Sequence, residues 1–282
     1  MKLGEFTQEL TNTFREVGFE QPLSEAQLLI SGVLGQTRSQ IISEDQQELT
    51  IYQLALLQAA VSRRQKGEPL AYILGKKDFF KASFAVGPHV LIPRPETELL
   101  VEVALEKFPT TNQPLQIADF GAGSGCIGLS ILLERPFAKL VAIENSVEAH
   151  VFLKKNIATY QLDSRVVVNG GTVEDFKRAQ LFDLIVANPP YIAHGDKNVM
   201  PAVHQFEPHV ALYSDQMGLG AIRRWAQKSA ELLKPDGFLL MEIGADQETQ
   251  LREEPWDQWG LKLIEVRNDL AGLPRLIVVV LS

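Results

Sequence analysis

The chain has 282 residues, 45% of them hydrophobic and 22% charged, a composition typical of a soluble globular protein whose length favours two domains. The formal net charge of -8 weighs against direct nucleic-acid binding through phosphate neutralisation, and a single cysteine excludes an internal disulfide and a thiolate zinc site. No apolar run is long enough to cross a membrane, and the first residues lack the apolar core of a signal peptide, so we expect a cytoplasmic protein.

Residues 1–75 are predicted to form a helical domain. The apolar residues of the first segment recur three or four positions apart on one helix face: Leu3, Phe6, Leu10, Phe14 and Val17. Two later segments begin with a hydroxyl residue followed three positions on by glutamine, as in Ser24 with Gln27 and Thr50 with Gln53. In this pattern the hydroxyl caps the helix start while the glutamine reaches back, so each pair predicts a further helix.

Residues 76–96 are predicted to form a β-hairpin and a linker, because β-favouring runs flank a short polar break and three prolines follow. From 97 to 282, strands and helices alternate. The expected strands are "LQIADF", "KLVAIE", "RVVV", "FDLIVA", "GFLLMEIG", "LKLIEVR" and "RLIVVVL". Such apolar strands are typical of a parallel sheet covered on both faces, so we expect the α/β class, with a doubly wound, seven-stranded Rossmann-like domain.

The first of these strands runs into "ADFGAGSGCIG", a candidate nucleoside site, since ligands bind beyond the carboxyl ends of such strands. Gly121, Gly123 and Gly125 allow close approach of the backbone to a ligand, and Glu144, which ends the next strand, suits two ribose hydroxyls. The alternatives are a plain turn, a dinucleotide or S-adenosylmethionine. A dinucleotide prefers glycine where Cys126 stands, so the spacing favours S-adenosylmethionine. Cys126 is predicted to be a small core residue rather than a nucleophile.

The fourth strand ends in "NPPY", from Asn188 to Tyr191, on the same edge as the glycine loop. Pro189 and Pro190 stiffen the strand end and have no N–H, so the segment offers acceptors: the Asn188 side-chain oxygen and the Pro189 carbonyl. Two fixed acceptors beside the Tyr191 ring suit a planar NH2 group, in an amide or on a nucleobase. Holding both hydrogens in line with a sulfonium methyl would orient the nitrogen lone pair for transfer. The alternative is an Asn-Pro turn without function.

Taken together, the motifs resemble the release factor glutamine methyltransferases, the PrmC/HemK family. The resemblance rests on the helical start, "GEPLAYILG", "LIPRPETELLVE", "DFGAGSG", "NPPYI", "FEPHVALYSDQMGL" and "DLAGLPR". It implies methylation of the glutamine in the Gly-Gly-Gln motif of class 1 peptide chain release factors, gripped in part by the helical domain. "NPPY" alone also occurs in adenine methyltransferases, so a second hypothesis is methylation of an exocyclic amine in DNA or RNA. A third is a donor-binding protein without turnover.

The resemblance also implies roles for individual residues. The residues expected to bind S-adenosylmethionine are Gly121, Ala122, Gly123, Ser124, Gly125, Glu144, Val173 and Asn188. The residues expected to receive the glutamine are Asn188, Pro189, Pro190 and Tyr191. Arg94 and Glu96 are expected to support the site. No metal is implied, and we expect a monomer.

One position departs from the family pattern. The family commonly has an acidic residue followed by an aromatic one near the adenine, where this chain has Thr172 and Val173, with Glu174 and Asp175 next. His89, His150, His204 and His209 have no metal-ligand spacing and are expected in surface or loop positions, as is His194. No chemistry is assigned to the three tryptophans.

Overall fold

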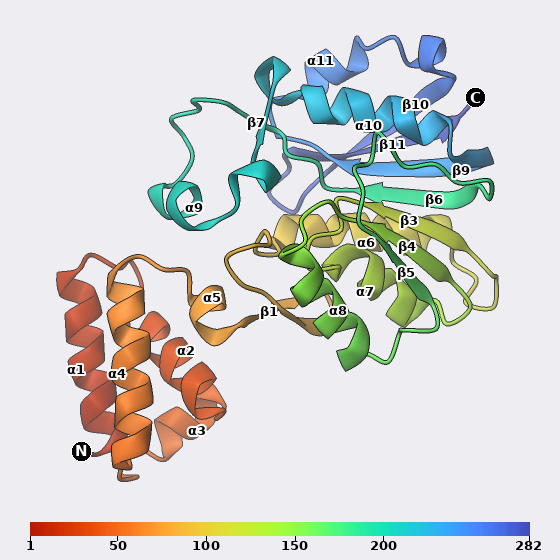
Figure 1. The fold of residues 1–282 in the computed structure, drawn as a ribbon. Coiled ribbons are helices and arrows are strands. Elements are labelled where there is room, and N and C mark those ends of the chain that lie inside the picture. Colours follow the sequence, from red (N-terminus) through yellow and green to blue (C-terminus); the bar gives the residue numbers. More distant parts are fainter. The chain divides into compact units, whose positions relative to one another are not determined.

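The structure is a computed structural model that describes the whole chain, residues 1–282. It divides into two compact units, Met1–Gly75 and Lys76–Ser282, which are coloured along the sequence in Figure 1. None of the helices combines the length and the hydropathy needed to cross a membrane.

The first unit consists of helices. They are α1 (Leu3–Glu16), α2 (Pro22–Leu34), α3 (Arg38–Ser43), α4 (Ile51–Gln65) and α5 (Leu70–Leu74). Its core contains the apolar residues of one face of α1, together with α2, α3 and α4: Leu3, Phe6, Leu10, Phe14, Ala26, Leu29, Ile30, Ile41, Leu49, Leu57 and Ala60. The capping box predicted for Thr50 and Gln53 is confirmed, and an unpredicted one at Thr37 and Gln40 starts α3.

Two details of the predicted helices are wrong. Val17 lies beyond the end of α1 and is 52% exposed, so it is not part of the buried stripe. Ser24 does not cap α2, because that helix already begins at Pro22, whose ring restricts φ to a helical value. Gln27 instead accepts a hydrogen bond from Arg38 at 2.8 Å.

The second unit opens with the predicted hairpin, β1 (Lys76–Phe79) and β2 (Ala82–Ala85), paired so that Phe79 faces Ala82. The side-chain amide of Asn156 ties β2 to α8 by accepting from the Ala85 N–H at 2.7 Å and donating to the Ala85 carbonyl at 3.1 Å. The hairpin is therefore anchored to the helix that lies below the sheet in Figure 1.

A seven-stranded sheet forms the centre of the second unit, in the order β10-β11-β9-β6-β3-β4-β5. The strands are β3 (Gln116–Phe120), β4 (Lys139–Ile143), β5 (Val166–Asn169), β6 (Phe182–Ala187), β9 (Leu233–Glu242), β10 (Leu261–Asn268) and β11 (Pro274–Leu281). All seven predicted strands are confirmed. The sheet is not wholly parallel, because β11 runs antiparallel to both β9 and β10. The apolar runs that predicted these strands do not encode strand direction, so the sequence pattern could not reveal this reversal.

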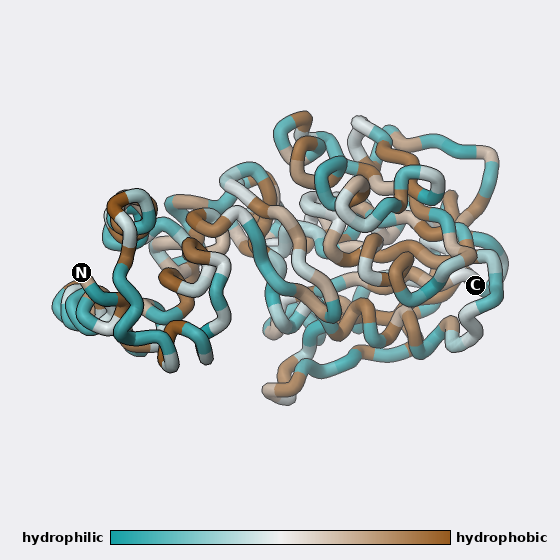
Figure 2. The backbone as a smooth tube through the Cα atoms, turned by 90° about the horizontal axis from the view of Figure 1, so that it is seen from below, coloured by the Kyte–Doolittle hydropathy of each residue, from teal (hydrophilic) through white to brown (hydrophobic).

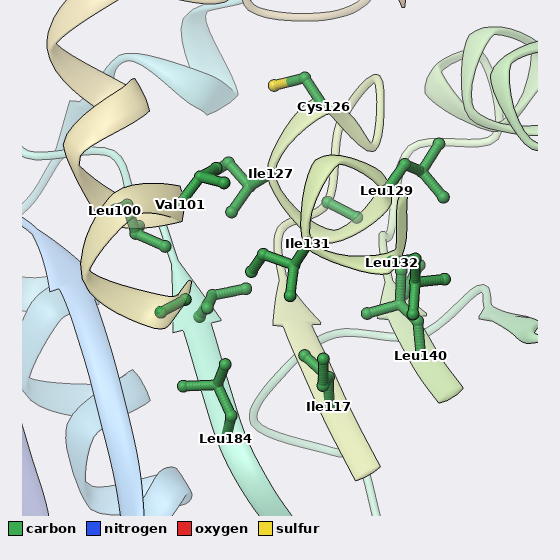
Figure 3. Close-up of a cluster of buried hydrophobic side chains, with 14 of the residues drawn as sticks. Leu100, Val101, Ile117, Cys126, Ile127, Leu129, Ile131, Leu132, Leu140 and Leu184 are labelled. Carbon is green, nitrogen blue, oxygen red and sulfur yellow. The ribbon is translucent and has the colours of Figure 1, made fainter. Parts of the chain in front are cut away.

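Helices cover both faces of the sheet (Figure 1). One face carries α6 (Glu98–Lys107), α7 (Cys126–Glu134) and α8 (Ala149–Thr159), and the other carries α10 (Gly220–Ala230) and α11 (Glu248–Arg252). Figure 3 shows side chains of α6 and α7 packed on β3, β4 and β6, with Cys126 at the start of α7. In Figure 2, hydrophobic stretches of backbone run through the interior of this unit, as expected for buried strands.

The connection between β6 and α10 is a long insertion over residues 192–214. It contains β7 (Ile192–Ala193), α9 (Pro201–Phe206), a 3-10 turn (His209–Ala211) and β8 (Tyr213–Ser214), with β7 and β8 paired in parallel. Neither short strand was predicted. The remaining 3-10 turns are Pro95–Thr97, Gln216–Gly218 and Trp256–Trp259.

Candidate active site

Two cavities lie beyond the carboxyl ends of the parallel strands, both lined by residues of the second unit. The first adjoins the glycine loop after β3 and the ends of β4, β5 and β6. The second lies between the end of β6 and the insertion over residues 192–214. The prediction that "NPPY" and the glycine loop share one edge is confirmed, because β3 and β6 are parallel neighbours in the sheet.

The three glycines of the loop all have positive φ, and they differ in the space available for a side chain. A side chain at Gly121 would meet the Trp225 ring at 2.6 Å, and one at Gly125 would meet Leu153 at 2.6 Å. At Gly123, with φ of +54°, the nearest atom to an added Cβ is a carbonyl oxygen 3.9 Å away, so this position opens on the cavity. The loop therefore offers bare backbone to a ligand at Gly123.

Glu144 and Asn156 hold this loop in place. The two carboxylate oxygens of Glu144 accept the N–H groups of Gly123 and Ser146, each at 2.8 Å. The Asn156 amide, which is buried, donates to the carbonyl of Ser124 at 2.8 Å. Each Glu144 oxygen still has acceptor capacity toward the cavity, as two ribose hydroxyls would require.

Most of the residues predicted to bind the cofactor line the first cavity: Gly121, Ala122, Gly123, Ser124, Glu144, Val173 and Asn188. Gly125 does not line it and instead forms the N-cap of α7. Thr172 and Glu174 line the wall beside Val173, which is buried.

Asn188 is the point at which the two cavities meet. It lines both of them, whereas Pro190 lines the first only and Pro189 and Tyr191 line the second only. The Asn188 amide nitrogen donates to the Thr97 hydroxyl at 3.3 Å, which turns the amide oxygen away from Thr97. Asn188 is therefore one of four residues shared by the two cavities, with Leu91, Arg94 and Ala211, and the only one of the four in "NPPY".

An ion pair joins the linker to the insertion beside the two cavities. Arg94, which lines both, contacts the buried Glu207 at 2.5 Å, and Glu207 also accepts the N–H of Ile92 at 3.1 Å. Ala211 of the insertion lines both cavities as well. Arg94 is therefore placed to support the site. Glu96 is exposed and lines neither cavity.

Burial controls the ionisation of several groups on this edge. It raises the pKa of the Cys126 thiol to about 12, which suits a core residue and not a nucleophile. Burial raises the pKa of Asp119 to about 7. The hydrogen bond from the Gly128 N–H stabilises the ionised carboxylate and so acts in the opposite direction. The pKa of the Tyr191 phenol is raised, first by burial and then by the negative charge of Glu242, to whose carboxylate it donates at 3.1 Å.

The histidines are not arranged as metal ligands, and no group of three or more His, Cys, Asp or Glu side chains is placed to hold a metal ion. His204 and His209 stack at 4.6 Å within the insertion, and His194 stacks on Tyr213 at 5.6 Å. His150 contacts the carbonyl of Glu144 at 2.8 Å and does not line the first cavity.

Sequence reasoning missed four residues of this site: Thr97, Glu207, Trp225 and Glu242. Trp225 lines the first cavity although no tryptophan was given a role. A signal existed for Glu242, because it interrupts the apolar strand "GFLLMEIG" just where the other strands end in site residues. Thr97, Glu207 and Trp225 lie in segments whose approach to the sheet edge only the tertiary fold reveals.

In comparisons with known proteins, two family models match separate parts of the chain. The PrmC N-terminal domain model matches residues 5–75, and the methyltransferase small domain model matches residues 96–209. The chain is 35% identical to the release factor glutamine methyltransferase of Caulobacter vibrioides (94% of this chain, 91% of that one) and 38% identical to that of Neisseria gonorrhoeae (90% and 92%). A bifunctional methyltransferase of Rickettsia conorii is 32% identical over 96% of this chain, which spans 56% of that protein. Among solved structures, a methyltransferase from Pyrococcus furiosus shares the fold, with a TM-score of 0.52, 17% identity and coverage of 79% of this chain and 96% of that one.

Proposed function

The chain belongs to the release factor glutamine methyltransferase family, and on that premise we propose how its site methylates the side-chain amide of a glutamine. The proposed substrate is the glutamine of the Gly-Gly-Gln motif in class 1 peptide chain release factors. The observation that carries the proposal is Asn188, which lines both cavities at the end of the central strand.

The donor is S-adenosylmethionine, and the first cavity suits it. The backbone at Gly123 is open to a ligand, Glu144 offers acceptors for the ribose, and Val173 and Trp225 supply apolar wall for a purine. When bound, the cofactor supplies an electrophilic methyl group on a sulfonium. The chain's own residues have to hold the acceptor nitrogen in line with that methyl group.

The acceptor amide is proposed to enter through the second cavity. An amide nitrogen is a poor nucleophile, because its lone pair is delocalised into the carbonyl. The Asn188 oxygen and the Pro189 carbonyl would accept its two N–H groups, which turns the lone pair toward the donor and stabilises the positive charge that develops on nitrogen. No strong base is needed if the proton leaves after transfer, and none of the histidines lines the second cavity.

The helical unit is proposed to grip the release factor. On α4, the exposed residues Tyr52, Ala55, Leu56 and Ala59 recur at helical spacing, so they form one apolar face. Tyr52 is 72% exposed, and an aromatic side chain of this kind suits a protein interface. This face is a candidate contact for a protein substrate.

The proposed setting is the cytoplasm, where release factors act in translation. The enzyme is proposed to work as a monomer and to bind no nucleic acid directly. The net charge of -8 supports recognition of a protein over a polyphosphate backbone. Light scattering of the purified chain checks the monomer, and a nuclease-resistant labelled product checks the choice of substrate.

Labelling with tritiated S-adenosylmethionine and a purified release factor tests the function. We expect label on the parent release factor and none when its Gly-Gly-Gln glutamine is replaced by alanine. Label that persists on the alanine variant would refute the glutamine assignment. Label found only on added nucleic acid would favour the exocyclic-amine hypothesis.

A further inference from the structure

The turn that follows the insertion has a backbone conformation that side chains rarely adopt. Its residues Gln216, Met217 and Gly218 have φ of +51°, +58° and +87°. Glycine adopts such angles freely, and asparagine and aspartate do so at times, but for a long apolar side chain they are unfavourable. Strain of this kind persists only where the surrounding structure holds it, and it is concentrated at functional sites.

Hydrogen bonds on both sides hold the turn. The Asp215 carbonyl accepts the Gly218 N–H at 3.0 Å, and the Asp215 carboxylate accepts from Arg224 with both oxygens at 3.1 Å. The side-chain oxygen of Gln216 accepts from Arg223 at 2.7 Å. The backbone is therefore fixed before and after the central residue of the turn.

The turn packs directly on the end of "NPPY". A Cβ added to Gly218 would meet the Tyr191 carbonyl oxygen at 2.1 Å, and the same oxygen accepts from the Gln247 side chain at 3.0 Å. Tyr191 lines the second cavity. Met217 is next to Gly218 in the chain, and consecutive Cα atoms lie about 3.8 Å apart. Met217 is nevertheless 81% exposed, so the strained turn places an apolar side chain in solvent beside the acceptor site.

A second exposed methionine belongs to the same cavity. Met200 lines it, immediately before α9, and is 67% exposed. The insertion that carries α9 extends beyond the sheet in Figure 1. Single exposed apolar residues are common, but packing within the chain gives no reason to hold Met217 in a strained backbone. Methionine is flexible and polarisable, which suits it to contact with another protein.

We infer that Met217 and Met200 are apolar anchors for the release factor surface around the acceptor glutamine. The inference rests on the proposed function and deepens it, because it names residues that receive the protein substrate beside the second cavity. The two glycines of the Gly-Gly-Gln motif have no side chains, so the apolar contact has to come from residues outside the motif. A protein interface of ordinary size covers about 800 Å² on each partner, a patch roughly 30 Å across. A release factor whose glutamine reaches Asn188 therefore covers both methionines.

Met217→Asn separates an anchor from a structural residue, because its two expected effects have opposite value for the enzyme. Asparagine adopts a left-handed backbone more readily, so the midpoint of thermal unfolding should rise by about 2 °C or more. The KM for an intact release factor should rise about fivefold, because the apolar contact is lost. A structural residue would change the unfolding temperature and leave KM as it is.

Three further variants complete the kinetic comparison. Met217→Leu keeps an apolar side chain in the same backbone and should keep KM within about twofold of the parent. Met200→Gln keeps the length of the side chain and should raise KM about fivefold. Phe137→Ser is the matched control, since Phe137 is 58% exposed and precedes β4, at the opposite edge of the sheet. None of these variants should change KM for a short peptide that contains Gly-Gly-Gln.

Hydroxyl-radical footprinting, read by mass spectrometry, tests the contact without relying on turnover. Bound release factor should slow the oxidation of Met200 and Met217 about fivefold or more, and should leave Phe137 within about twofold of its rate in the free enzyme. If the parent labels the release factor glutamine while both methionines oxidise at unchanged rates and Met217→Asn keeps parental KM, the inference alone is overturned. If the parent transfers no methyl group to that glutamine, the proposed function fails and the inference with it.

Discussion

Asp119 is a buried carboxylate at the sheet edge that carries the site, and its environment has a measurable consequence. It is 1% exposed, its Oδ2 accepts the Gly128 N–H at 3.0 Å, and its Oδ1 has no partner in the chain. Burial, aided by the negative charge of Glu144, raises its pKa to about 7. The folded protein therefore keeps this proton over a range in which the unfolded chain has lost it.

Replacing Asp119 with asparagine should change how stability depends on pH. Between about pH 4 and pH 7 the folded state binds the extra proton, so this group makes the free energy of unfolding fall as pH rises, by up to about 1.4 kcal/mol per pH unit. Asp119→Asn cannot ionise and should lack that slope. Urea denaturation of both proteins at several pH values measures it, and parallel curves would contradict the buried ionisation.

Asn188→Ala should abolish most of the turnover. Loss of one well-aimed acceptor in the transition state costs about 3 kcal/mol, which is about a hundredfold or more in kcat. Asn198→Ala is the matched control, because Asn198 lines the second cavity without lining the first, and its loss should be at least about tenfold smaller. Equal effects of the two changes, measured as kcat on a release factor, would count against the role of Asn188.

At the scale of elements, the glycine loop shows what its sequence pattern could predict. The pattern predicted a turn and a ligand, and the cavity beside the loop agrees with a ligand. It could not predict that Gly121 and Gly125 are required by the packing of Trp225 and Leu153, because those residues lie 104 and 28 positions further along the chain. Only Gly123 faces open space.

Gly123→Ala should therefore weaken donor binding as well as the fold. A residue with a Cβ at positive φ costs about 1–2 kcal/mol of stability, and here the Cβ would also project into the donor site, raising the dissociation constant about tenfold or more. Gly260→Ala is a matched control, since Gly260 has φ of +71° and no atom near an added Cβ. Calorimetric titration should show weakened binding for the first variant and parental binding for the second.

The ion pair between Arg94 and the buried Glu207 ties the insertion over residues 192–214 to the linker. Glu207→Gln keeps an acceptor for the Ile92 N–H but removes the charge that holds Arg94. We expect faster amide hydrogen exchange in residues 192–214 and a raised KM for the release factor, because this segment roofs the second cavity. Unchanged exchange in that segment would show that other contacts hold it.

The elements themselves were largely predictable, and the exceptions share a cause. Long apolar runs revealed the seven strands of the central sheet. The short helix α5 and the strand pair β7–β8 have too few residues to show a repeating pattern of apolar positions, and they form through tertiary contacts. The same holds for the site: Asn188 and Glu144 end predicted strands, whereas Thr97 and Glu207 reach the edge from the linker and the insertion.

At the scale of the whole molecule, the apolar face of α4 predicts that the first unit helps to bind the release factor, whereas the second unit alone methylates a short peptide. The double variant Tyr52→Ser, Leu56→Ser should raise the KM for an intact release factor about tenfold, as expected when interface anchors are removed. Methylation of a short glutamine peptide should not change, because the second cavity is untouched. Ile42→Ser, at another exposed position of the same unit, is the control. Parental KM for the double variant would place the contact elsewhere.

The meeting of two cavities at Asn188 also restricts the order of events in a catalytic cycle. The two chambers share only a few lining residues, so neither reactant has to leave before the other can enter. The transfer then requires both reactants to be present together, and no methylated form of the enzyme needs to exist between them. Initial-rate plots should intersect rather than run parallel, and the spent donor should compete with fresh donor but not with the peptide.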